Sequence, residues 1–145
     1  MTVRHILASK NITEILTIAP DATIQEAARI LSEKRIGALI VSKNGQSLDG
    51  MLSERDIVRE LGRRGPECMM DKVSELMTEK VITASPSDIT VAALEKMTKG
   101  RFRHLPVMED GRMIGVVSIG DLVKGRIDEI EAENSALTGM IVGHG

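Results

Sequence analysis

The spacing of apolar and polar residues after Pro20 predicts an amphipathic helix. Apolar side chains occur at positions 24, 27, 28 and 31, and this i, i+3, i+4, i+7 spacing places them on one face of a helix. Thr23 followed by Glu26 is the sequence of a capping box, in which the two side chains bond to free backbone N–H groups. A helix of about ten residues is therefore expected to begin after Thr23.

Two short apolar runs and a second helix follow. Residues 39–41 (Leu-Ile-Val) are typical of a strand, Asn44-Gly45 indicates a turn, and the next apolar run continues the sheet. Another helix is expected to start at Asp56. Gly62 and the Gly65-Pro66 pair are expected to end it.

The same order of patterns returns later in the chain, which indicates a duplicated structural unit. The recurring segments are residues 3–7 and 73–77, 15–20 and 81–86, 37–41 and 104–108, and 50–56 and 115–121. Each copy contains a strand, a helix, two strands and a second helix, and would be marginally stable alone, so the copies are expected to join their cores. The predicted class is α+β. Its predicted segments are repeat 1 at residues 1–65, repeat 2 at 66–126, and a C-terminal amphipathic helix and tail at 127–145.

Composition narrows the classes of function. The net charge of −2 attracts neither nucleic acid nor anionic lipid, and Phe102 is the one aromatic side chain that could stack on a base, so nucleic-acid binding is disfavoured. No apolar run approaches the roughly 20 residues of a membrane helix and no signal peptide opens the sequence, so a cytoplasmic protein without membrane contact is expected. The single Cys68 excludes an intramolecular disulfide, and three scattered histidines leave no metal-ligand spacing.

A Gly-x-x-Ser-x-x-Asp pattern occurs once in each copy, where a strand is expected to lead into a helix. Its residues are Gly50, Ser53 and Asp56 in one copy and Gly115, Ser118 and Asp121 in the other. A Ser followed three residues later by an acid also caps a helix, so a single occurrence would need no ligand. The recurrence of the whole set favours a nucleotide. A helix N-terminus with a Ser hydroxyl suits a phosphate, and an Asp there can accept hydrogen bonds from ribose hydroxyls.

Two further stretches point to a known family. They are Ser-Glu-Arg-Asp at residues 53–56 and Phe-Arg-His-Leu-Pro-Val at residues 102–107. With them, residues 2–126 resemble tandem cystathionine-β-synthase (CBS) repeats, or Bateman modules, and above all small bacterial stand-alone CBS pairs. The resemblance implies two βαββα units related by a pseudo-twofold axis, with two nucleotide clefts between their sheets. It implies an adenine nucleotide as ligand: AMP first, with ADP, ATP, S-adenosylmethionine or an NAD-type dinucleotide as alternatives.

The resemblance also implies residue roles, each cleft taking Ser and Asp from one repeat and base contacts from the other. In the first cleft, Asp121 would hold the ribose and Ser118, Arg103 and His104 the phosphate. Arg103 is the favoured anchor because a guanidinium bonds phosphate through two parallel hydrogen bonds. The alternative for Arg103 is a solvated charge on the surface. The alternative for His104 is a half-buried residue with a packing role. The base would lie among Thr17, Ala22, Ile36 and Ala38.

The second cleft would use the other copy of the motif. Its residues would be Thr83, Val107, Met51, Ser53, Arg55 and Asp56. In the sequence alignment of the repeats, Ile36 and Gly37 match Arg103 and His104, and neither can hold a phosphate by charge. Arg55, with Arg59 one turn later, would compensate. Two unequal sites are therefore expected, this one being weaker or suited to a dinucleotide.

Beyond repeat 2, apolar residues follow the alternating steps of four and three that are typical of a coiled-coil seam. The seam positions are Val123, Ile127, Ile130, Asn134, Leu137 and Ile141. A polar Asn134 can fix the register of a two-stranded pair. One prediction is a homodimer in which this helix crosses to the partner. The alternative is a helix that packs on its own domain.

Together these features predict a regulatory module that senses cellular energy or redox state. A bound adenine nucleotide would shift its conformation, and an effector protein would read that change. The alternative is a nucleotide-independent interaction or dimerisation module whose Ser and Asp residues only cap helices. Catalysis is not expected, because no nucleophile–base pair is evident and the two motif Asp residues belong to separate repeats. No catalytic cofactor or metal is expected.

Overall fold

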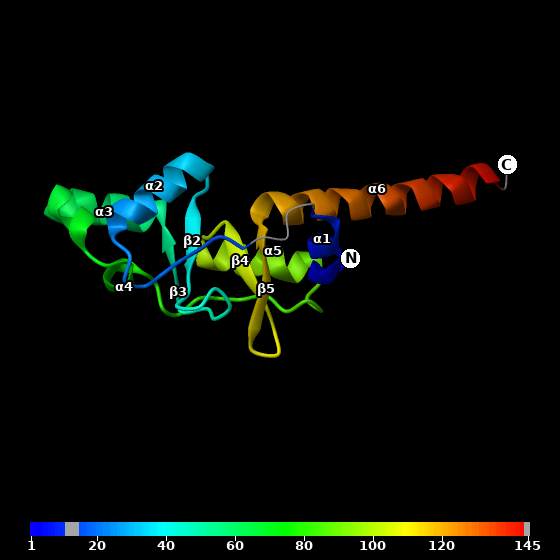
Figure 1. The fold of residues 1–145 in the computed structure, drawn as a ribbon. Coiled ribbons are helices and arrows are strands. Elements are labelled where there is room, and N and C mark those ends of the chain that lie inside the picture. The colour runs from blue at the N-terminus through cyan, green and yellow to red at the C-terminus, as the bar shows by residue number, and fades with distance from the viewer. Residues whose placement is uncertain (11–14, 144–145) are drawn as a thin grey trace.

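The computed structural model describes residues 1–10 and 15–143, which form two units side by side and a helix that projects from one of them (Figure 1). In the first unit, β1 (Thr17–Ile18) pairs parallel with β2 (Ala38–Val41), which pairs antiparallel with β3 (Gly50–Ser53). Helices α2 (Ile24–Lys34) and α3 (Glu54–Arg64) contribute their apolar faces to the core that covers this sheet.

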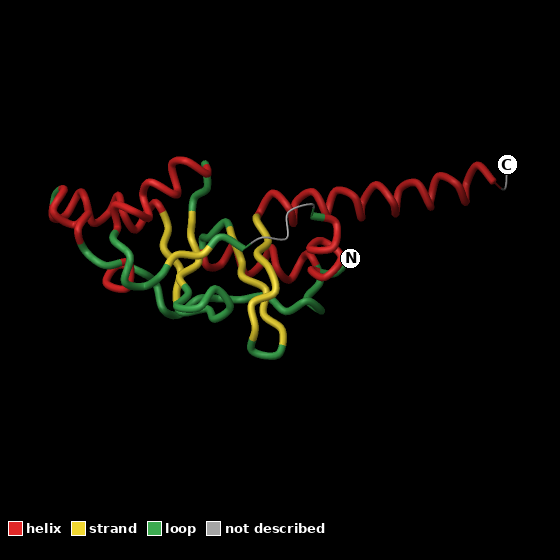
Figure 2. Tube along the Cα trace, in the orientation of Figure 1, coloured by secondary structure: helices red, strands yellow, loops and turns green. Residues whose placement is uncertain are grey.

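The second unit repeats this arrangement with a sheet of two strands instead of three. Strands β4 (His104–Glu109) and β5 (Arg112–Ser118) are antiparallel, and α5 (Thr90–Gly100) packs on them. Where β1 would be expected, Ala84 forms a single parallel bridge to Val107. In Figure 2 the strands of both units lie in the middle of the molecule, with α2 and α3 at one end. The fold is α+β, as predicted.

Local chemistry explains the helix ends. Thr23 Oγ1 accepts a hydrogen bond from Glu26 N (3.2 Å) at the start of α2, as expected of a cap. The expectation that Gly62 ends the next helix is wrong: α3 continues through it, because glycine inside a helix costs only about 1 kcal/mol. The helix ends at Gly65, whose φ of 82° suits a residue without a side chain. Pro66 then opens the short 3-10 helix η1 (Pro66–Met70).

Strand register shows how the two repeats correspond. Ala38 pairs with Ser53, and His104 pairs with Ser118. Both units reach their strand in the same way, because α2 and α5 each end at an arginine in the left-handed conformation, three residues before the paired position. His104 is therefore equivalent to Ala38.

It follows that the sequence alignment of Arg103 and His104 with Ile36 and Gly37 is wrong by one residue. The carbonyl oxygens of Gly37 and Arg103 accept equivalent hydrogen bonds (2.9 and 2.8 Å) from the first N–H of the next helix. Hydrogen-bond register, and not the resemblance of the apolar runs, decides this correspondence. The equivalents of Arg103 and His104 are Gly37 and Ala38, which also carry no charge.

The two units exchange short segments. Helix α1 (Val3–Ser9) precedes the first unit in sequence but packs in the core of the second, and Val3 N donates to Asp88 O (2.9 Å). Helix α4 (Val73–Leu76) follows the first unit and packs back into its core, with Val73 N donating to Ala22 O (2.8 Å). Each core therefore contains residues from both sequence repeats.

The glycines of the repeated motif make this exchange possible. A Cβ at Gly50 would lie 2.6 Å from Met77 Sδ and 2.9 Å from Thr78 O, closer than real Cβ contacts. A Cβ at Gly115 would lie 2.7 Å from Leu7 Cδ2. The motif glycine thus has a packing role, since it lets the exchanged segment approach the strand.

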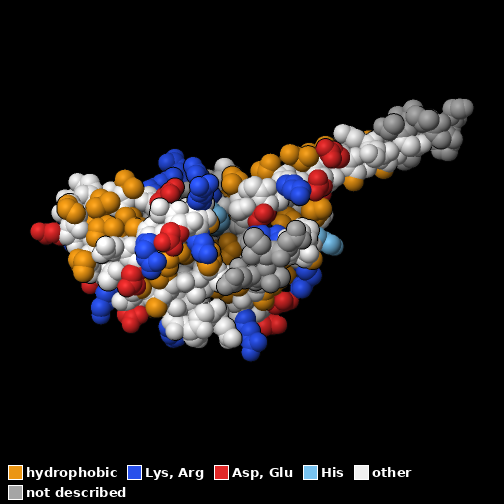
Figure 3. All heavy atoms as spheres, turned by 45° about the horizontal axis from the view of Figure 1, so that its top comes forward, with side chains coloured by type: hydrophobic (Ala, Val, Ile, Leu, Met, Phe, Trp, Pro, Cys, Tyr) orange, Lys and Arg blue, Asp and Glu red, His pale blue; other side chains and the backbone are white. Residues whose placement is uncertain are grey.

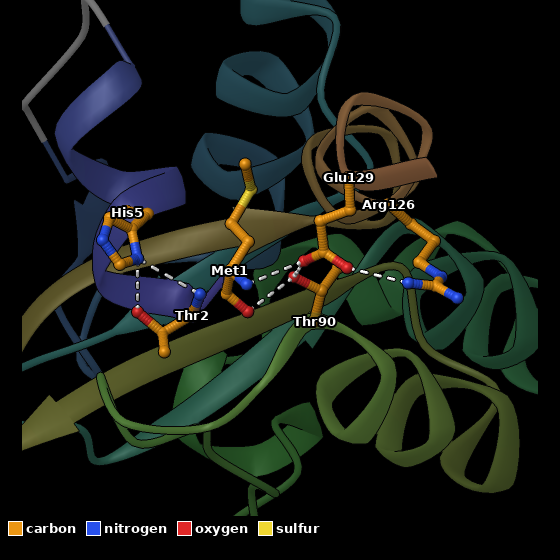
Figure 4. Close-up of polar contacts among 6 residues, drawn as sticks. All are labelled: Met1, Thr2, His5, Thr90, Arg126 and Glu129. Carbon is orange, nitrogen blue, oxygen red and sulfur yellow. Dashed lines mark hydrogen bonds and ion pairs between the residues drawn. The ribbon is translucent and has the colours of Figure 1, made fainter. Parts of the chain in front are cut away.

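Helix α6 (Ile119–Gly143) continues without a break from the second unit into the C-terminal extension. Its inner face is held by Glu129, which accepts hydrogen bonds from Thr90 Oγ1 (2.9 Å) and Arg126 Nη1 (2.9 Å) and pairs with the Met1 ammonium (3.2 Å) (Figure 4). These interactions lower the pKa of Glu129, although its loss of hydration acts in the opposite direction. Within residues 1–10 and 15–143, no helix has the length and apolar character needed to cross a membrane.

Candidate functional site

A cavity of about 400 Å³ lies between the two units. The first unit contributes Gly37, Ala38, Met51, residues 53–56 and Arg59, and the second unit contributes Thr78, residues 80–82 and residues 100–104. The lining includes apolar groups such as Met51 and Phe102. The cavity therefore combines residues of both repeats, as a ligand site between them requires.

Ser53 and Asp56 cap α3 and line the cavity at the same time. Asp56 Oδ2 accepts hydrogen bonds from Ser53 N (2.9 Å) and Ser53 Oγ (2.9 Å), and Asp56 N donates to Ser53 Oγ (3.2 Å). The other carboxylate oxygen, Oδ1, lies 4.0 Å from Arg59 Nη1. The capping interpretation and the site interpretation therefore do not exclude each other.

Positive charge dominates the lining. Five of the residues around the cavity are Lys or Arg, and two are acids. The cations are Arg55, Arg59, Lys80, Arg101 and Arg103, and the acids are Glu54 and Asp56. Such a surplus of cations around one cavity favours an anionic ligand.

His104 contributes little to that charge. Burial lowers the pKa of its ring, and the nearby cations Lys10 and Arg103 lower it further, against the opposing effect of Asp121. The ring is therefore mostly neutral at pH 7, and arginine and lysine side chains supply most of the positive charge of this region.

The second copy of the motif forms the same capping arrangement on α6. Ser118 N donates to Asp121 Oδ2 (2.9 Å), and Asp121 N donates to Ser118 Oγ (3.0 Å). Here the carboxylate has an additional partner, Lys10 Nζ at 2.8 Å, which also donates to Val116 O (2.9 Å). Burial alone would raise the pKa of Asp121, but the hydrogen bonds from Lys10 and Ser118 lower it.

The structure groups the sequence-predicted residues differently from the prediction. Ala38, Arg103 and His104, which the resemblance assigned to the Asp121 cleft, line the cavity of Ser53 and Asp56. Asp121 is also close enough to His104 to raise the pKa of its ring, so His104 stands between the two motif copies. Met51 and Arg55 line the cavity together with Ser53 and Asp56.

The remaining predicted base contacts lie elsewhere. Val107 is completely buried in the second core, and residues 80–82 line the cavity in place of Thr83. Thr17 lies on β1, and Ala22 and Ile36 pack against the first core. Cys68 is a buried free thiol. Among the described residues, no group of three or more His, Cys, Asp or Glu side chains could hold a metal ion.

Sequence reasoning missed two lysines. Lys80 lines the cavity, and Lys10 binds Asp121. They lie three positions after the equivalent residues Met77 and Leu7, which contact the two motif glycines. The signal was therefore present in the repeat of residues 3–7 and 73–77, had the alignment been extended by three residues.

Two copies of one small α+β unit, each with the same capped Ser and Asp, define a tandem-repeat protein with a ligand-sized cavity between its repeats. The chain belongs to the CBS-domain family, whose model, described as CBS domain, matches residues 3–63 and 73–128.

Relatives cover most of this chain. CBS domain-containing protein CBSX3, mitochondrial, of Arabidopsis thaliana is 39% identical over 127 residues, which are 85% of this chain and 62% of CBSX3. The chain thus spans less than two thirds of that relative. CBS domain-containing protein YhcV of Bacillus subtilis (strain 168) is 32% identical over 128 residues, which are 88% of this chain and 89% of YhcV.

Solved structures share the fold, and some contain ligands. The CBS-domain containing protein ATU1752 from Agrobacterium tumefaciens has a TM-score of 0.80 at 39% identity, covering 86% of this chain and 92% of that chain. The CBS domain pair of protein MJ0100, in complex with 5′-methylthioadenosine and S-adenosyl-L-methionine, has a TM-score of 0.73 at 28% identity, covering 89% and 98%. PAE2072 from Pyrobaculum aerophilum, complexed with AMP, has a TM-score of 0.70 at 27% identity, covering 83% and 89%.

Proposed function

We propose that this protein is a regulatory module that binds a phosphorylated adenine nucleotide between its two repeats. In the cytoplasm, it would report cellular energy or redox state to an effector protein through a change of conformation, and it would carry out no catalysis itself. The CBS-domain fold and the adenosine ligands of two structural relatives support the adenosine moiety of this proposal. The charge of the cavity supports the phosphate.

The five cations that line the cavity are the observation that carries the proposal. Phosphate oxygens accept charge-assisted hydrogen bonds from Arg and Lys, which are about twice as strong as hydrogen bonds between neutral groups. 5′-Methylthioadenosine has no phosphate or other anionic group. In S-adenosylmethionine the single carboxylate is accompanied by an ammonium and a sulfonium, so neither ligand brings net negative charge to these cations. AMP, ADP, ATP and NAD-type dinucleotides all do.

The residues divide by chemistry into three roles. We assign the ribose hydroxyls to Asp56, whose Oδ1 is not used by the Ser53 cap. Arg103 and Lys80, from the second unit, and Arg55, from the first, would bind phosphate. The base would lie against apolar lining residues, which are Ala38, Met51, Val81, Ile82 and Phe102.

The proposal keeps two unequal sites but reverses their order. The Asp121 carboxylate is already bonded to Lys10 (2.8 Å), so a ribose there has to displace an ion pair. The Asp56 carboxylate has a more distant cation, Arg59 at 4.0 Å. We therefore assign the tighter site to Ser53 and Asp56. Ser118 and Asp121, with Thr17, Ala22 and Ile36, remain the proposed weaker site.

Isothermal titration calorimetry with a matched ligand series tests this function. The series is AMP, ADP, ATP, NAD, adenosine, 5′-methylthioadenosine and S-adenosylmethionine. We expect AMP to bind at least about tenfold more tightly than adenosine, because a charge-assisted phosphate contact contributes about 1.5–3 kcal/mol. Equal affinities for AMP and adenosine would remove the phosphate assignment, and no binding of any member would remove nucleotide sensing.

A nucleotide-independent interaction module remains the second candidate. Both Ser–Asp pairs complete their capping boxes without any ligand, which is what this candidate requires. Hydrogen exchange with and without AMP separates the two functions, since a ligand that binds only the folded state raises its stability by about 2.7 kcal/mol at a concentration of 100 Kd. Unchanged exchange at saturating AMP would favour the interaction module.

A further inference from the structure

The ends of α1 and α4 differ, although these two helices are equivalent parts of the two repeats. Leu7 and Met77 occupy equivalent positions, since each contacts the glycine of a Gly-x-x-Ser-x-x-Asp motif. Helix α4 ends at Leu76, and Met77 already has extended backbone angles (φ −65°, ψ 155°). Helix α1 continues to Ser9 and becomes extended only at Lys10. The chain therefore leaves the helix three residues earlier in one repeat than in the other.

Backbone contacts at the start of the two helices are matched. In each case the residue before the helix forms an isolated antiparallel bridge, and the first residue of the helix donates its N–H to a loop carbonyl. The matched bridges are Thr23 with Lys72 and Ile89 with Thr2, and the matched hydrogen bonds are Val73 N to Ala22 O (2.8 Å) and Val3 N to Asp88 O (2.9 Å). The two helices therefore begin in the same way and differ at their ends.

One contact of the first unit has no counterpart in the second. Met51, which follows the motif glycine, forms an antiparallel bridge with Thr78, in which Met51 N donates to Thr78 O (3.0 Å) and Thr78 N to Met51 O (2.9 Å). The equivalent pair would be Val116 and Ala8, and no bridge joins them among the described residues. Instead, Lys10 Nζ donates to Val116 O (2.9 Å). A lysine side chain thus takes the place of a backbone hydrogen bond.

The two equivalent lysines also differ in their partners. Lys10 Nζ lies 2.8 Å from Asp121 Oδ2. Among the ion pairs of residues 1–10 and 15–143, none joins Lys80 to Asp56; Lys80 lines the cavity, and Asp56 has Arg59 at 4.0 Å. Where the chain is helical the lysine binds the motif acid, and where the chain is extended the lysine lines the cavity. The conformation of this short segment therefore goes together with the state of the site.

The second unit holds the start of α1 more firmly than its end. Ile6 is buried (4% exposed), and a Cβ at Gly125 of α6 would lie 3.1 Å from Ile6 Cδ1. Ala8 and Ser9 are exposed, and a helix of seven residues gains little stability of its own. The last turn can therefore change its conformation without exposing the core.

The outer face of α6 takes no part in this contact. The side chains of the predicted seam at Val123, Ile127, Ile130 and Leu137 are exposed and do not pack on their own domain, and the side chain of Ile141 lies outside the described residues. Figure 3 shows hydrophobic side chains along this projecting helix. The homodimer expected from the seam stays a prediction.

We propose that Lys10 and the last turn of α1 form a latch that closes the Asp121 site in the absence of ligand. The latch rests on the function proposed above, in which a phosphorylated adenine nucleotide is the ligand. The ribose hydroxyls take over the Asp121 carboxylate, and the freed Lys10 ammonium binds the phosphate. Residues 7–9 then leave the helix, and Ala8 forms the missing backbone bridge with Val116. The ligand shifts this equilibrium because it binds only the open state.

Nuclear magnetic resonance of the full chain tests the latch without any ligand, because the α- and β-carbon chemical shifts of residues 7–9 distinguish helix from extended backbone. We expect helical shifts in wild type and a move towards extended values in Lys10→Met, which keeps an apolar stem but cannot pair with Asp121. Lys99→Met, at an exposed position of α5, is the matched control and should keep the helical shifts. Unchanged helical shifts in Lys10→Met would overturn the latch.

A titration followed by the Ser118 and Asp121 amide signals tests the link to the ligand. When AMP fills this site of wild type, residues 7–9 should move to extended shifts. In Lys10→Met, adenosine should bind up to about fivefold more tightly, because no ion pair has to be displaced. The preference for AMP over adenosine should fall at least about tenfold, because the phosphate contact is lost.

Two results would contradict the latch: helical shifts of residues 7–9 with the site filled by AMP, or equal effects of Lys10→Met on AMP and adenosine. If no nucleotide changes the Ser118 and Asp121 signals, the proposed function of this site fails instead. The comparison of ligand-free wild type with Lys10→Met then decides by itself whether the latch exists.

Discussion

Arg103 links the second unit to the proposed phosphate position, because it lines the cavity at the start of β4. We predict that Arg103→Ala weakens AMP binding by about 1.5–3 kcal/mol, or roughly 10- to 100-fold, through the loss of a charged hydrogen bond. Adenosine affinity should stay the same. Calorimetry measures both ligands, and Arg112→Ala, a surface arginine on β5, is the control. An equal loss for AMP and adenosine would show that Arg103 supports the fold of the site and not the phosphate.

The Lys10–Asp121 pair gives a prediction about acid stability. The folded pKa of Asp121 is below its ordinary value, so its contribution to stability is complete above the unfolded pKa of about 3.9 and is lost as the pH falls through the lower, folded value. Lys10→Met removes the charge but keeps an apolar stem. It should lower the free energy of unfolding at pH 7 by up to about 1 kcal/mol.

At pH 2 the same substitution should cost less than at pH 7, because pH 2 lies below the unfolded pKa of Asp121 and the contribution of the carboxylate is lost as the folded state takes up its proton. Urea unfolding followed by circular dichroism at the two pH values measures the difference. Lys99→Met, at an exposed position of α5, serves as the control. A stability loss of equal size at pH 7 and pH 2 would mean that Lys10 acts through packing and not through its charge.

At the scale of elements, the motif glycine lets each strand contact an exchanged segment: Gly50 of β3 lies against residues 77–78, and Gly115 of β5 lies against Leu7. Gly50→Ala would bring a Cβ to 2.9 Å from the Thr78 carbonyl oxygen, so backbone has to move, and we expect a destabilisation of about 1–3 kcal/mol. Gly62→Ala is the opposite case. No atom lies within 4 Å of its added Cβ in α3, so helix propensity should stabilise the protein by up to about 1 kcal/mol. Thermal unfolding of both variants measures the contrast, and a neutral Gly50→Ala would contradict the close approach.

Local patterns were sufficient to predict most elements. The apolar spacing after Thr23 gave the correct helix, and the turn at Asn44-Gly45 separates two strands as expected. Both Ser–Asp pairs could be identified because a cap involves residues only three positions apart. Gly62 was misinterpreted because propensity is weaker than the packing of a whole helix.

Contacts between distant segments could not be read from the sequence. Lys10 reaches Asp121, and Lys80 reaches the cavity of Ser53, only because α1 packs in the core of the second unit and α4 in the core of the first, so that each helix leaves its own sequence repeat. The same exchange decides which residues form one cavity. Apolar periodicity predicts that a segment is buried, but it does not specify which of two similar cores receives it.

For the whole molecule, segment exchange makes each unit dependent on the other. Ile6 lies in the first sequence repeat but in the core of the second unit, and Val73 has the reverse placement. When either core unfolds, it therefore frees a helix that belongs to the sequence repeat of the other core. A shared ligand between the units would add to this dependence, since its contacts come from both sides of the cavity.

We therefore predict that the two units unfold together. Ile6→Ala removes a side chain that is 4% exposed in the second core and should cost about 2–5 kcal/mol. Because unfolding is shared, hydrogen exchange measured by mass spectrometry should show the same loss of protection in peptides from α2, in the first unit, and α5, in the second. Ile130→Ala, at an exposed position of α6, should leave the protection of both core helices unchanged. If Ile6→Ala weakened protection in α5 alone, the units would open independently, and a ligand that binds both would be needed to couple them.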